Sequence, residues 1–87
     1  MLTISDLLNR GLLKVGEEIV FTRRSLKIEH RAQIQANGLI ITEDGKTHRS
    51  PSGAAKHFTK KPIDGWHAWK VRSSQRTLAN LRAQIKE

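Results

Sequence analysis

The sequence has no cysteine, and aromatic residues make up only 5% of it. Without cysteine, the chain can form neither a disulfide framework nor a thiolate metal site, which fits a reducing compartment. The longest apolar runs, such as residues 38–42, fall far short of the roughly 20 residues that cross a bilayer, and the start lacks a signal-peptide pattern. We therefore expect a cytoplasmic protein, nucleoid-associated if bacterial, without a membrane partner.

Acidic residues are scarce in the second half of the chain. Residues 1–45 carry six basic and six acidic residues, whereas residues 46–86 carry ten basic residues and one acidic residue, Asp64. The net charge of +8 thus comes from the second half. A positive field attracts polyanions, of which nucleic acid is the most abundant inside a cell. A merely solubilising surface has the same composition, so charge alone leaves both interpretations open.

A chain of 87 residues is expected to form one domain, residues 1–87, with a thin core and little room for a substrate cleft. Ser5 or Thr3 can cap a short helix that Gly11 ends, and a strand follows in which Ile19 and Phe21 share one face.

Two turn dipeptides dominate the middle of the chain. Asn-Gly at 37 and 38 and Asp-Gly at 44 and 45 favour hairpin turns, so residues 28–49 are expected to form a three-stranded meander. Two-residue loops would pair Ile34 with Ile41 and Ile41 with His48, which places these three side chains on the core face. The opposite face would then be polar and basic, and would carry Ile40 and Thr42.

The segment "SPSGAAKHF" predicts a helix, because proline suits a first turn and Ser50 suits the cap, with Ser52 as an alternative cap. Residues 66–71, "WHAWKV", are interpreted as a last strand that turns Trp69 into the core and Trp66 outward. A terminal helix starting at Ser73 or Ser74 would carry an apolar stripe of Leu78, Leu81 and Ile85. The expected fold is α+β: a small antiparallel sheet with a short N-terminal helix, a Ser-Pro helix packed on it and a C-terminal helix.

Catalysis is poorly supported by the sequence. The serines lack a nucleophile elbow, and the four histidines lack carboxylate partners at a ligand spacing. Glu43 and Asp44 weakly suggest a metal-dependent nuclease, but Asp44 is already explained by its hairpin turn. We expect no enzyme activity, no catalytic residue, no metal site and no cofactor.

Binding of a polyanion has a better physical case. Lysines and arginines on the Ser-Pro helix, after it and on the polar sheet face can hold phosphates. The expected phosphate-binding residues are Lys56, Lys60, Lys61, Lys70, Arg72, Arg49 and Arg31. Phosphate contacts carry no sequence information, so contacts to a base or a modification would come from side chains that include an aromatic face. The candidates are Ser50, Ser52, His57, Trp66 and His67. Both serines also suit plain helix capping, and either tryptophan also suits plain packing.

The order "DLLNRGLLKVGEEIVF", "ANGLIITEDGK", "SPSGAAKHF" and "DGWHAWKV" resembles the RAMA domain, associated with restriction-type adenine methylases, across residues 5–72. It is similar to the C-terminal domain of cell-cycle-regulated adenine methyltransferases. The resemblance implies a small α+β module that binds DNA and occurs fused to methyltransferases, restriction nucleases or JAB-type proteins. Asp64 stands where many relatives have asparagine, and a methylase motif of the Asp-Pro-Pro-Tyr type is absent from the chain.

From the residues and this resemblance we expect a non-catalytic DNA-binding module. It would read adenine-methylated DNA or help a restriction-modification enzyme bind its target. Its partners would be double-stranded DNA, with or without N6-methyladenine, and a methyltransferase or nuclease. The alternative is a protein-interaction module that tethers a partner enzyme through the apolar stripe of the terminal helix or a sheet edge, without touching DNA.

Overall fold

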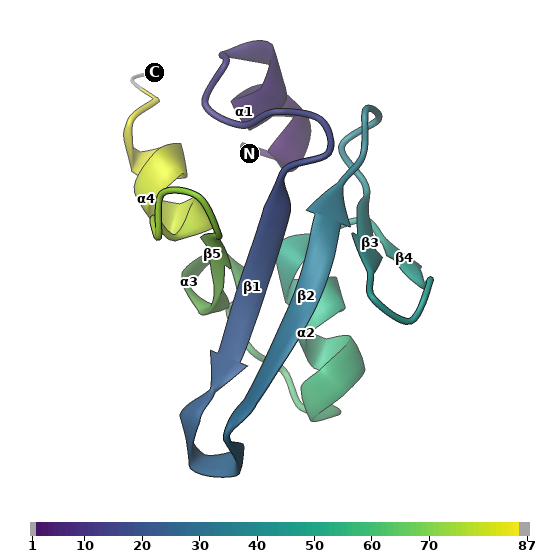
Figure 1. Ribbon diagram of the computed structural model, residues 1–87. Helices are drawn as coiled ribbons and strands as arrows, with labels where there is room; N and C mark the ends of the chain where they lie inside the picture. The colour runs from purple at the N-terminus through teal and green to yellow at the C-terminus, as the bar shows by residue number, and fades with distance from the viewer. Residues whose placement is uncertain (1, 86–87) are drawn as a thin grey trace.

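The computed structural model describes residues 2–85 and arranges them as an antiparallel sheet with helices packed against it (Figure 1). The sheet has five strands in the order β4-β3-β2-β1-β5. The strands are β1 (Glu18–Arg23), β2 (Ile28–Ile34), β3 (Ile40–Thr42), β4 (Thr47–His48) and β5 (Trp69–Val71). The helices are α1 (Ile4–Asn9), α2 (Pro51–Thr59), α3 (Gly65–Ala68) and α4 (Leu78–Ala83), and a 3₁₀ turn, η1 (Arg24–Leu26), follows β1. The expected α+β fold is confirmed. Within residues 2–85, none of the helices is long and apolar enough to cross a membrane.

Both expected hairpin turns form, but each has three loop residues rather than two. The Gln35 N–H donates to the carbonyl of Leu39 at 2.8 Å, and the Thr42 N–H donates to the carbonyl of Lys46 at 2.8 Å. Gly38 ends the first loop with φ 82°, and the second ends in the same way. A type I turn followed by a residue in the left-handed region has this geometry, and glycine adopts that region without strain.

The extra loop residue makes the predicted faces of β3 wrong. Ile34 pairs with Ile40 rather than with Ile41, and Ile40 in turn pairs with His48. Ile40 and Thr42 are buried, with 0% and 2% of their surface exposed, whereas Ile41 lies on the other face. A slip of one residue turns every side chain of a strand to the opposite face. The predicted faces of β2 are correct, with Ile34 inward.

One face of the sheet is covered and the other is open. The covered face presents Ile19, Phe21 and their neighbours to the core, with α2 behind the sheet in Figure 1. Strand pairing places Arg31 opposite Val20 and Val20 opposite Lys70, so these three side chains share the other face. We call this second surface the open sheet face. It carries Glu18, Val20, Thr22, Glu29, Arg31, Gln33, Ile41, Thr47, Lys70 and Arg72.

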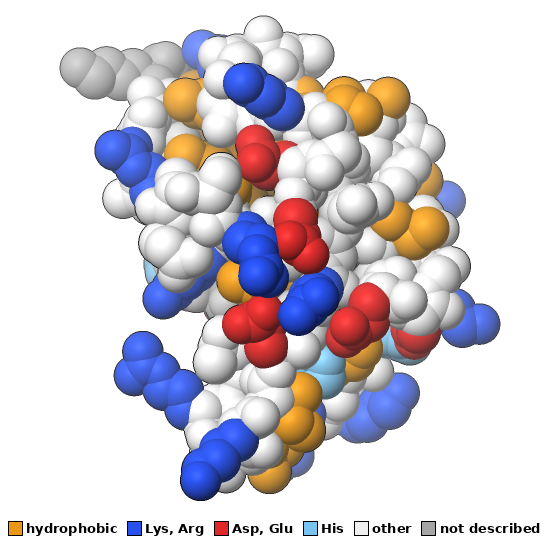
Figure 2. Space-filling model, in the orientation of Figure 1, with side chains coloured by type: hydrophobic (Ala, Val, Ile, Leu, Met, Phe, Trp, Pro, Cys, Tyr) orange, Lys and Arg blue, Asp and Glu red, His pale blue; other side chains and the backbone are white. Residues whose placement is uncertain are grey.

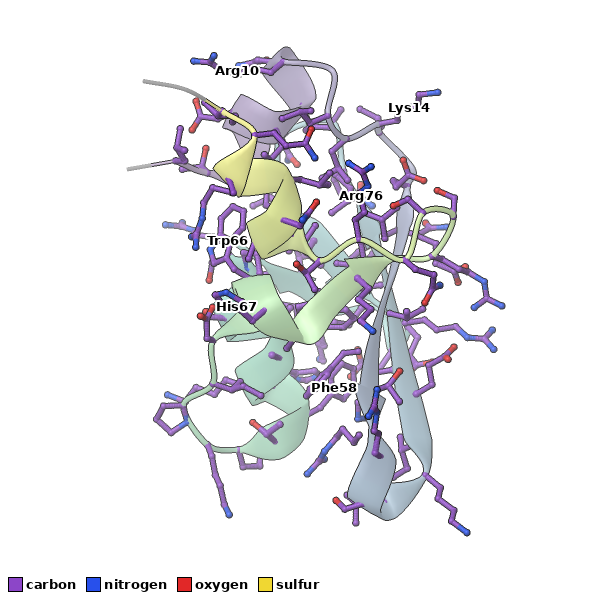
Figure 3. The ribbon with its side chains drawn as sticks, turned by 90° about the vertical axis from the view of Figure 1, so that its left-hand side faces the viewer. Arg10, Lys14, Phe58, Trp66, His67 and Arg76 are labelled. Atoms are coloured by element: carbon purple, nitrogen blue, oxygen red, sulfur yellow. The ribbon has the colours of Figure 1, made fainter. Side chains whose placement is uncertain are left out.

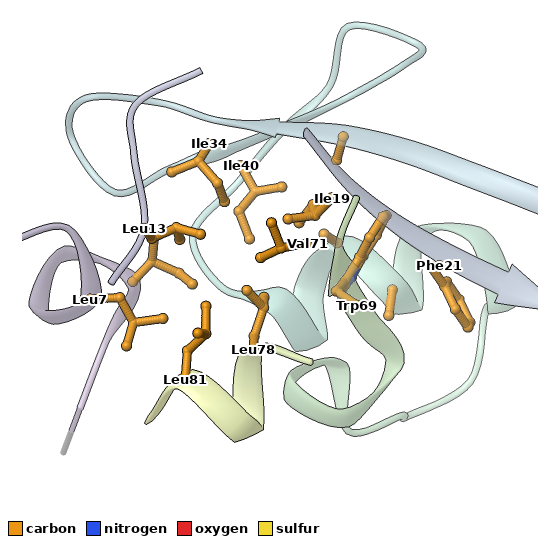
Figure 4. Packing of buried hydrophobic residues seen from close by; sticks show 14 of the residues in the cluster. Leu7, Leu13, Ile19, Phe21, Ile34, Ile40, Trp69, Val71, Leu78 and Leu81 are labelled. Atoms are coloured by element: carbon orange, nitrogen blue, oxygen red, sulfur yellow. The ribbon is translucent and has the colours of Figure 1, made fainter. Parts of the chain in front are cut away.

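The core lies between the covered face and the helices (Figure 4). As expected, Trp69 enters it from β5 with no exposed surface. The apolar stripe of Leu78, Leu81 and Ile85 also faces the core, with at most 9% of each residue exposed. Because the stripe is buried in the core, it is not available as a docking surface for a partner. The helix that carries most of it begins later than expected, because Thr77 rather than Ser73 or Ser74 is its cap.

The α2 and α3 segments meet backbone against backbone. The indole N–H of Trp69 donates to the carbonyl of Pro51 at 3.1 Å, and the Gly65 N–H donates to the hydroxyl of Ser52 at 3.0 Å. A Cβ on Gly65 would overlap the backbone of Pro51 and Ser52, so only glycine fits this crossing. Asp64 caps the short helix that follows by accepting from the Trp66 N–H at 3.0 Å. The prediction of a strand over residues 66–71 is therefore wrong for its first three residues, which are helical.

Candidate nucleic-acid interface

The seven basic residues expected to bind phosphate do not share one surface. Arg31, Lys70 and Arg72 lie on the open sheet face. Lys56, Lys60 and Lys61 belong to α2 and the residue pair after it, on the opposite side of the sheet (Figure 1). Arg49 is exposed just before the cap of α2.

Carboxylates compensate the charge of the open sheet face. Arg72 places its Nε 3.3 Å from Glu18 and its Nη1 3.4 Å from Glu29, and Arg31 places its Nε 3.7 Å from the same Glu29 carboxylate. Figure 2 shows the blue and red side chains interleaved along the middle of this face. Exposed ion pairs of this kind add little stability, but they cancel much of the positive field. Arg31 and Arg72 are therefore poorly suited to recruit a polyanion.

A different basic surface is formed by the β1–β2 turn and the end of α2, two segments that one hydrogen bond links. Arg23 Nη1 donates to the backbone carbonyl of Phe58 at 3.4 Å, which joins the end of β1 next to the turn to α2. The turn and the α2 terminus lie at the same end of the molecule in Figures 1 and 3. We define the basic end by its five cationic residues: Arg23, Arg24, Lys27, Lys60 and Lys61. Within residues 2–85, no carboxylate lies within 4.0 Å of these side-chain nitrogens.

Sequence reasoning found only the two lysines of this surface. Arg23, Arg24 and Lys27 stand in the run "RRSLK", which reads as the end of a strand and a loop. The three basic residues in this run are the only sign of this part of the surface in the sequence. The α2 segment that they join lies more than 30 residues further along the chain, and only the fold links the two segments.

Two lysines of the basic end occupy left-handed backbone positions. Lys27 has φ 53° and Lys60 has φ 61°, and both follow the end of a helical segment. Glycine is the usual residue there, because a side chain costs about 1–2 kcal/mol in this region. Backbone strain retained at a charged, exposed residue favours a role outside the fold.

The two serines expected to contact a base or modification are engaged in the fold. The Ser50 hydroxyl accepts from the Gly53 N–H at 3.0 Å and caps α2, as expected. The Ser52 hydroxyl accepts from the Gly65 N–H, as described above. Each hydroxyl already has a structural role as an acceptor and keeps one proton that it can donate to a ligand.

Trp66 and His67 lie together on α3 (Figure 3). Trp66 is half-buried against the core, and the Arg82 guanidinium lies 4.5 Å from its ring centroid. Such a cation–π pair leaves part of the indole accessible and adds a positive charge beside it. His67 is exposed and places Nδ1 2.5 Å from the Asp64 carboxylate, whose pKa is lowered chiefly by this hydrogen bond. This pair is the most accessible aromatic surface of the candidate base contacts.

His57 belongs to a cluster that ties the β3–β4 turn to α2. Its Nε2 lies 2.6 Å from Asp44, and the Thr42 hydroxyl donates to the same carboxylate at 2.5 Å. The Thr42 hydrogen bond, followed by that of His57, holds the pKa of Asp44 well below its ordinary value. Burial lowers the pKa of His30 and His48 beside it, which favours their neutral forms. His57 therefore serves first as a cross-link between α2 and the β3–β4 turn. Within residues 2–85, no group of three His, Asp or Glu side chains is placed to bind a metal ion.

A small cavity of about 250 Å³ lies beside the basic end, between β1 and α3. Arg24, His67 and Lys70 line it together with Thr22. These side chains connect the basic end to the exposed surface of α3. Lys70 thus borders a basic hollow, even though its strand neighbours on the open sheet face are ion-paired.

The protein is thus a small α+β module. Short helices cover one face of its five-stranded antiparallel sheet, and one end of the molecule is basic. The sequence model of the RAMA family, Restriction Enzyme Adenine Methylase Associated, matches residues 1–87, the whole chain. The protein belongs to this family. Its family is thus one of domains associated with restriction enzymes and adenine methylases, and the expected resemblance is confirmed. None of the curated proteins matches the chain.

Proposed function

We propose that the protein is a non-catalytic DNA-binding module that serves an adenine methylase or nuclease of a restriction-modification system. The observation that carries the proposal is the basic end, where five cationic side chains gather without a nearby carboxylate in residues 2–85. Elsewhere five carboxylates pair with Arg31, Arg72 or a histidine: Glu18, Glu29, Glu43, Asp44 and Asp64. Duplex DNA is the polyanion on which methylases and restriction enzymes act.

In this proposal the basic end holds the DNA backbone. Lysine and arginine side chains that neutralise phosphates release condensed counterions, so affinity falls steeply with salt. Lys56 and Lys70 flank the basic end on α2 and on the cavity beside β1, and extend the contact. Backbone contacts position the module and carry no sequence information.

Any discrimination between plain and methylated adenine is assigned to α3. Trp66 and His67 present an aromatic surface next to the cavity lined by Arg24 and Lys70. An apolar methyl group on an exposed base edge would gain contact with an indole face. Trp66→Ala is expected to reduce a preference for methylated duplex while leaving the salt dependence unchanged.

The proposal is tested by charge reversal at one end of the molecule and not at the other. Lys60→Glu with Lys61→Glu is compared with Arg10→Glu with Lys14→Glu, which makes the same change in net charge at the opposite end (Figure 3). Binding to plain and adenine-methylated duplexes is titrated at two salt concentrations. We expect the first variant to lower the slope of log affinity against log salt by about 1.8, that is about 0.9 for each lost phosphate contact.

The matched control decides whether position matters. The Arg10 and Lys14 variant is expected to bind with nearly the wild-type slope, since its charges lie away from the basic end. Equal losses in both variants would mean that only net charge matters. Binding that is unaffected by Lys60→Glu with Lys61→Glu would overturn the proposal.

A further inference from the structure

The β1–β2 turn exposes apolar side chains among its basic ones. The exposed large hydrophobic residues within residues 2–85 are Val15, Leu26 and Ile28, with 60%, 52% and 41% of their surface accessible. Two of the three flank Lys27 in the turn. In Figure 2, orange side chains lie at the lower end of the molecule with blue ones on either side. We call residues 24–28 the hairpin tip.

The hairpin tip is a supported projection rather than a loose loop. Six residue pairs join β1 to β2, from Glu18 with Gln33 to Arg23 with Ile28, so the ladder reaches the tip itself. The 3₁₀ turn η1 closes the tip, and the Lys27 N–H donates to the Arg24 carbonyl at 3.1 Å. The bond from Arg23 to the Phe58 carbonyl ties the end of β1 next to the tip to α2. The backbone of the tip is therefore held in place before any partner binds.

Because Leu26 and Ile28 are exposed, their side chains do not pack in the core and do little to stabilise the fold. Both side chains would therefore be stabilised by losing their contact with water. Their position next to Arg24 and on either side of Lys27 favours a partner that is apolar inside and anionic outside. The base pairs and flanking phosphates of a DNA groove have this arrangement.

We propose that the hairpin tip is a wedge that bends duplex DNA, with Leu26 and Ile28 entering between neighbouring base pairs. Arg24 and Lys27 bind the phosphates on either side of the opened step. The proposal rests on the DNA-binding function proposed above and specifies which DNA is bound best: duplexes that contain a flexible pyrimidine–purine step. Such steps unstack at low cost, and aliphatic side chains open them in other minor-groove proteins.

The test uses Leu26→Ser with Ile28→Thr, which removes apolar surface but no charge. Val15→Ser is the matched control, because it removes an apolar side chain outside the hairpin tip that is at least as exposed as Leu26 and Ile28. Leu26→Ser alone serves as a second variant if the double variant unfolds. Bending is measured by energy transfer between dyes at the duplex ends, and unstacking by the fluorescence of 2-aminopurine placed at the central step.

We expect wild-type protein and Val15→Ser to bend the duplex and to raise 2-aminopurine fluorescence. The tip variant should lose both signals and bind at least tenfold more weakly, a loss of at least about 1.4 kcal/mol, because two aliphatic side chains no longer leave water on binding. Its salt slope should equal that of the wild type, because the phosphate contacts remain.

The outcomes separate this proposal from the one on which it rests. DNA that is bound with the expected salt slope but stays straight overturns the wedge alone. Absence of any salt-dependent binding overturns the DNA-binding function as well. Vesicles of anionic lipid test the other surface that an apolar, basic tip could enter: tip-dependent vesicle binding without DNA bending would replace the wedge by a membrane contact.

Discussion

Replacement of Lys27 and Lys60 by asparagine separates stability from binding at the basic end. Both residues have positive φ, where a lysine side chain costs about 1–2 kcal/mol. Asparagine tolerates this region better than lysine and removes the charge. Because neither lysine has an ion-pair partner within residues 2–85, no stabilising contact of the charged group is lost.

The expected gain in the free energy of unfolding is about 0–1 kcal/mol per site, since asparagine relieves only part of the left-handed cost. For a domain of this size, each 1 kcal/mol raises Tm by about 4–8 °C. DNA affinity should move in the opposite direction. Each lost phosphate contact lowers the salt slope by about 0.9, so a variant that binds like the wild type at 1 M salt should bind about eightfold more weakly than the wild type at 0.1 M salt.

Thermal unfolding followed by circular dichroism and fluorescence anisotropy with a labelled duplex measure the two effects on the same samples. Gln75→Asn is the control for stability, because Gln75 has φ 63° and no charge. Lys14→Asn is the control for charge away from the basic end. A variant with lower Tm, or with unchanged affinity and slope, would refute the reasoning that strain is retained at these lysines for binding.

Three further changes test the fold. Gly65→Ala should destabilise the protein by about 1–3 kcal/mol in urea unfolding, because the new Cβ overlaps the Pro51 backbone; wild-type stability would contradict the close crossing. Trp69→Phe should cost about 1–3 kcal/mol by leaving the buried Pro51 carbonyl without its donor, and a smaller loss would mean that water replaces the indole. Burial lowers the pKa of His30 and His48, so the unfolded state takes up protons first as pH falls below about 6.5. The free energy of unfolding should therefore be lower at pH 5 than at pH 7, and a pH-independent value over this range would contradict the assignment.

The sequence located both hairpin turns but could not decide the register of β3. Asn-Gly and Asp-Gly suit two-residue loops and also three-residue loops that end in a left-handed glycine. The two choices differ by one residue, and "LIIT" does not alternate, so its pattern fits either face. Packing decides the matter, because Ile40 rather than Ile41 fills the core between Ile34 and His48.

For a similar reason, the sequence predicts only some of the residues of the candidate site. Lys60 and Lys61 stand out as a pair in the sequence, but their neighbours from the β1–β2 turn lie far away along the chain. The sequence predicts phosphate contacts by Arg31 from the polar sheet face and by Arg72 as part of the basic second half of the chain. Their pairing with Glu29, which lies two residues before Arg31 and far from Arg72 in sequence, follows from strand order and could not be read from composition.

The crossing of α2 and α3 has a consequence for how this protein can diverge or be redesigned. The residues that make its sequence recognisable, Pro51, Ser52, Gly65 and Trp69, hold one another in place and leave the hairpin tip untouched. Because the crossing of α2 and α3 fixes the fold, we expect the turn between β1 and β2 to accept other sequences without loss of the architecture. Grafting turns of other lengths or charges onto this frame is therefore a direct route to modules with new ligand preferences.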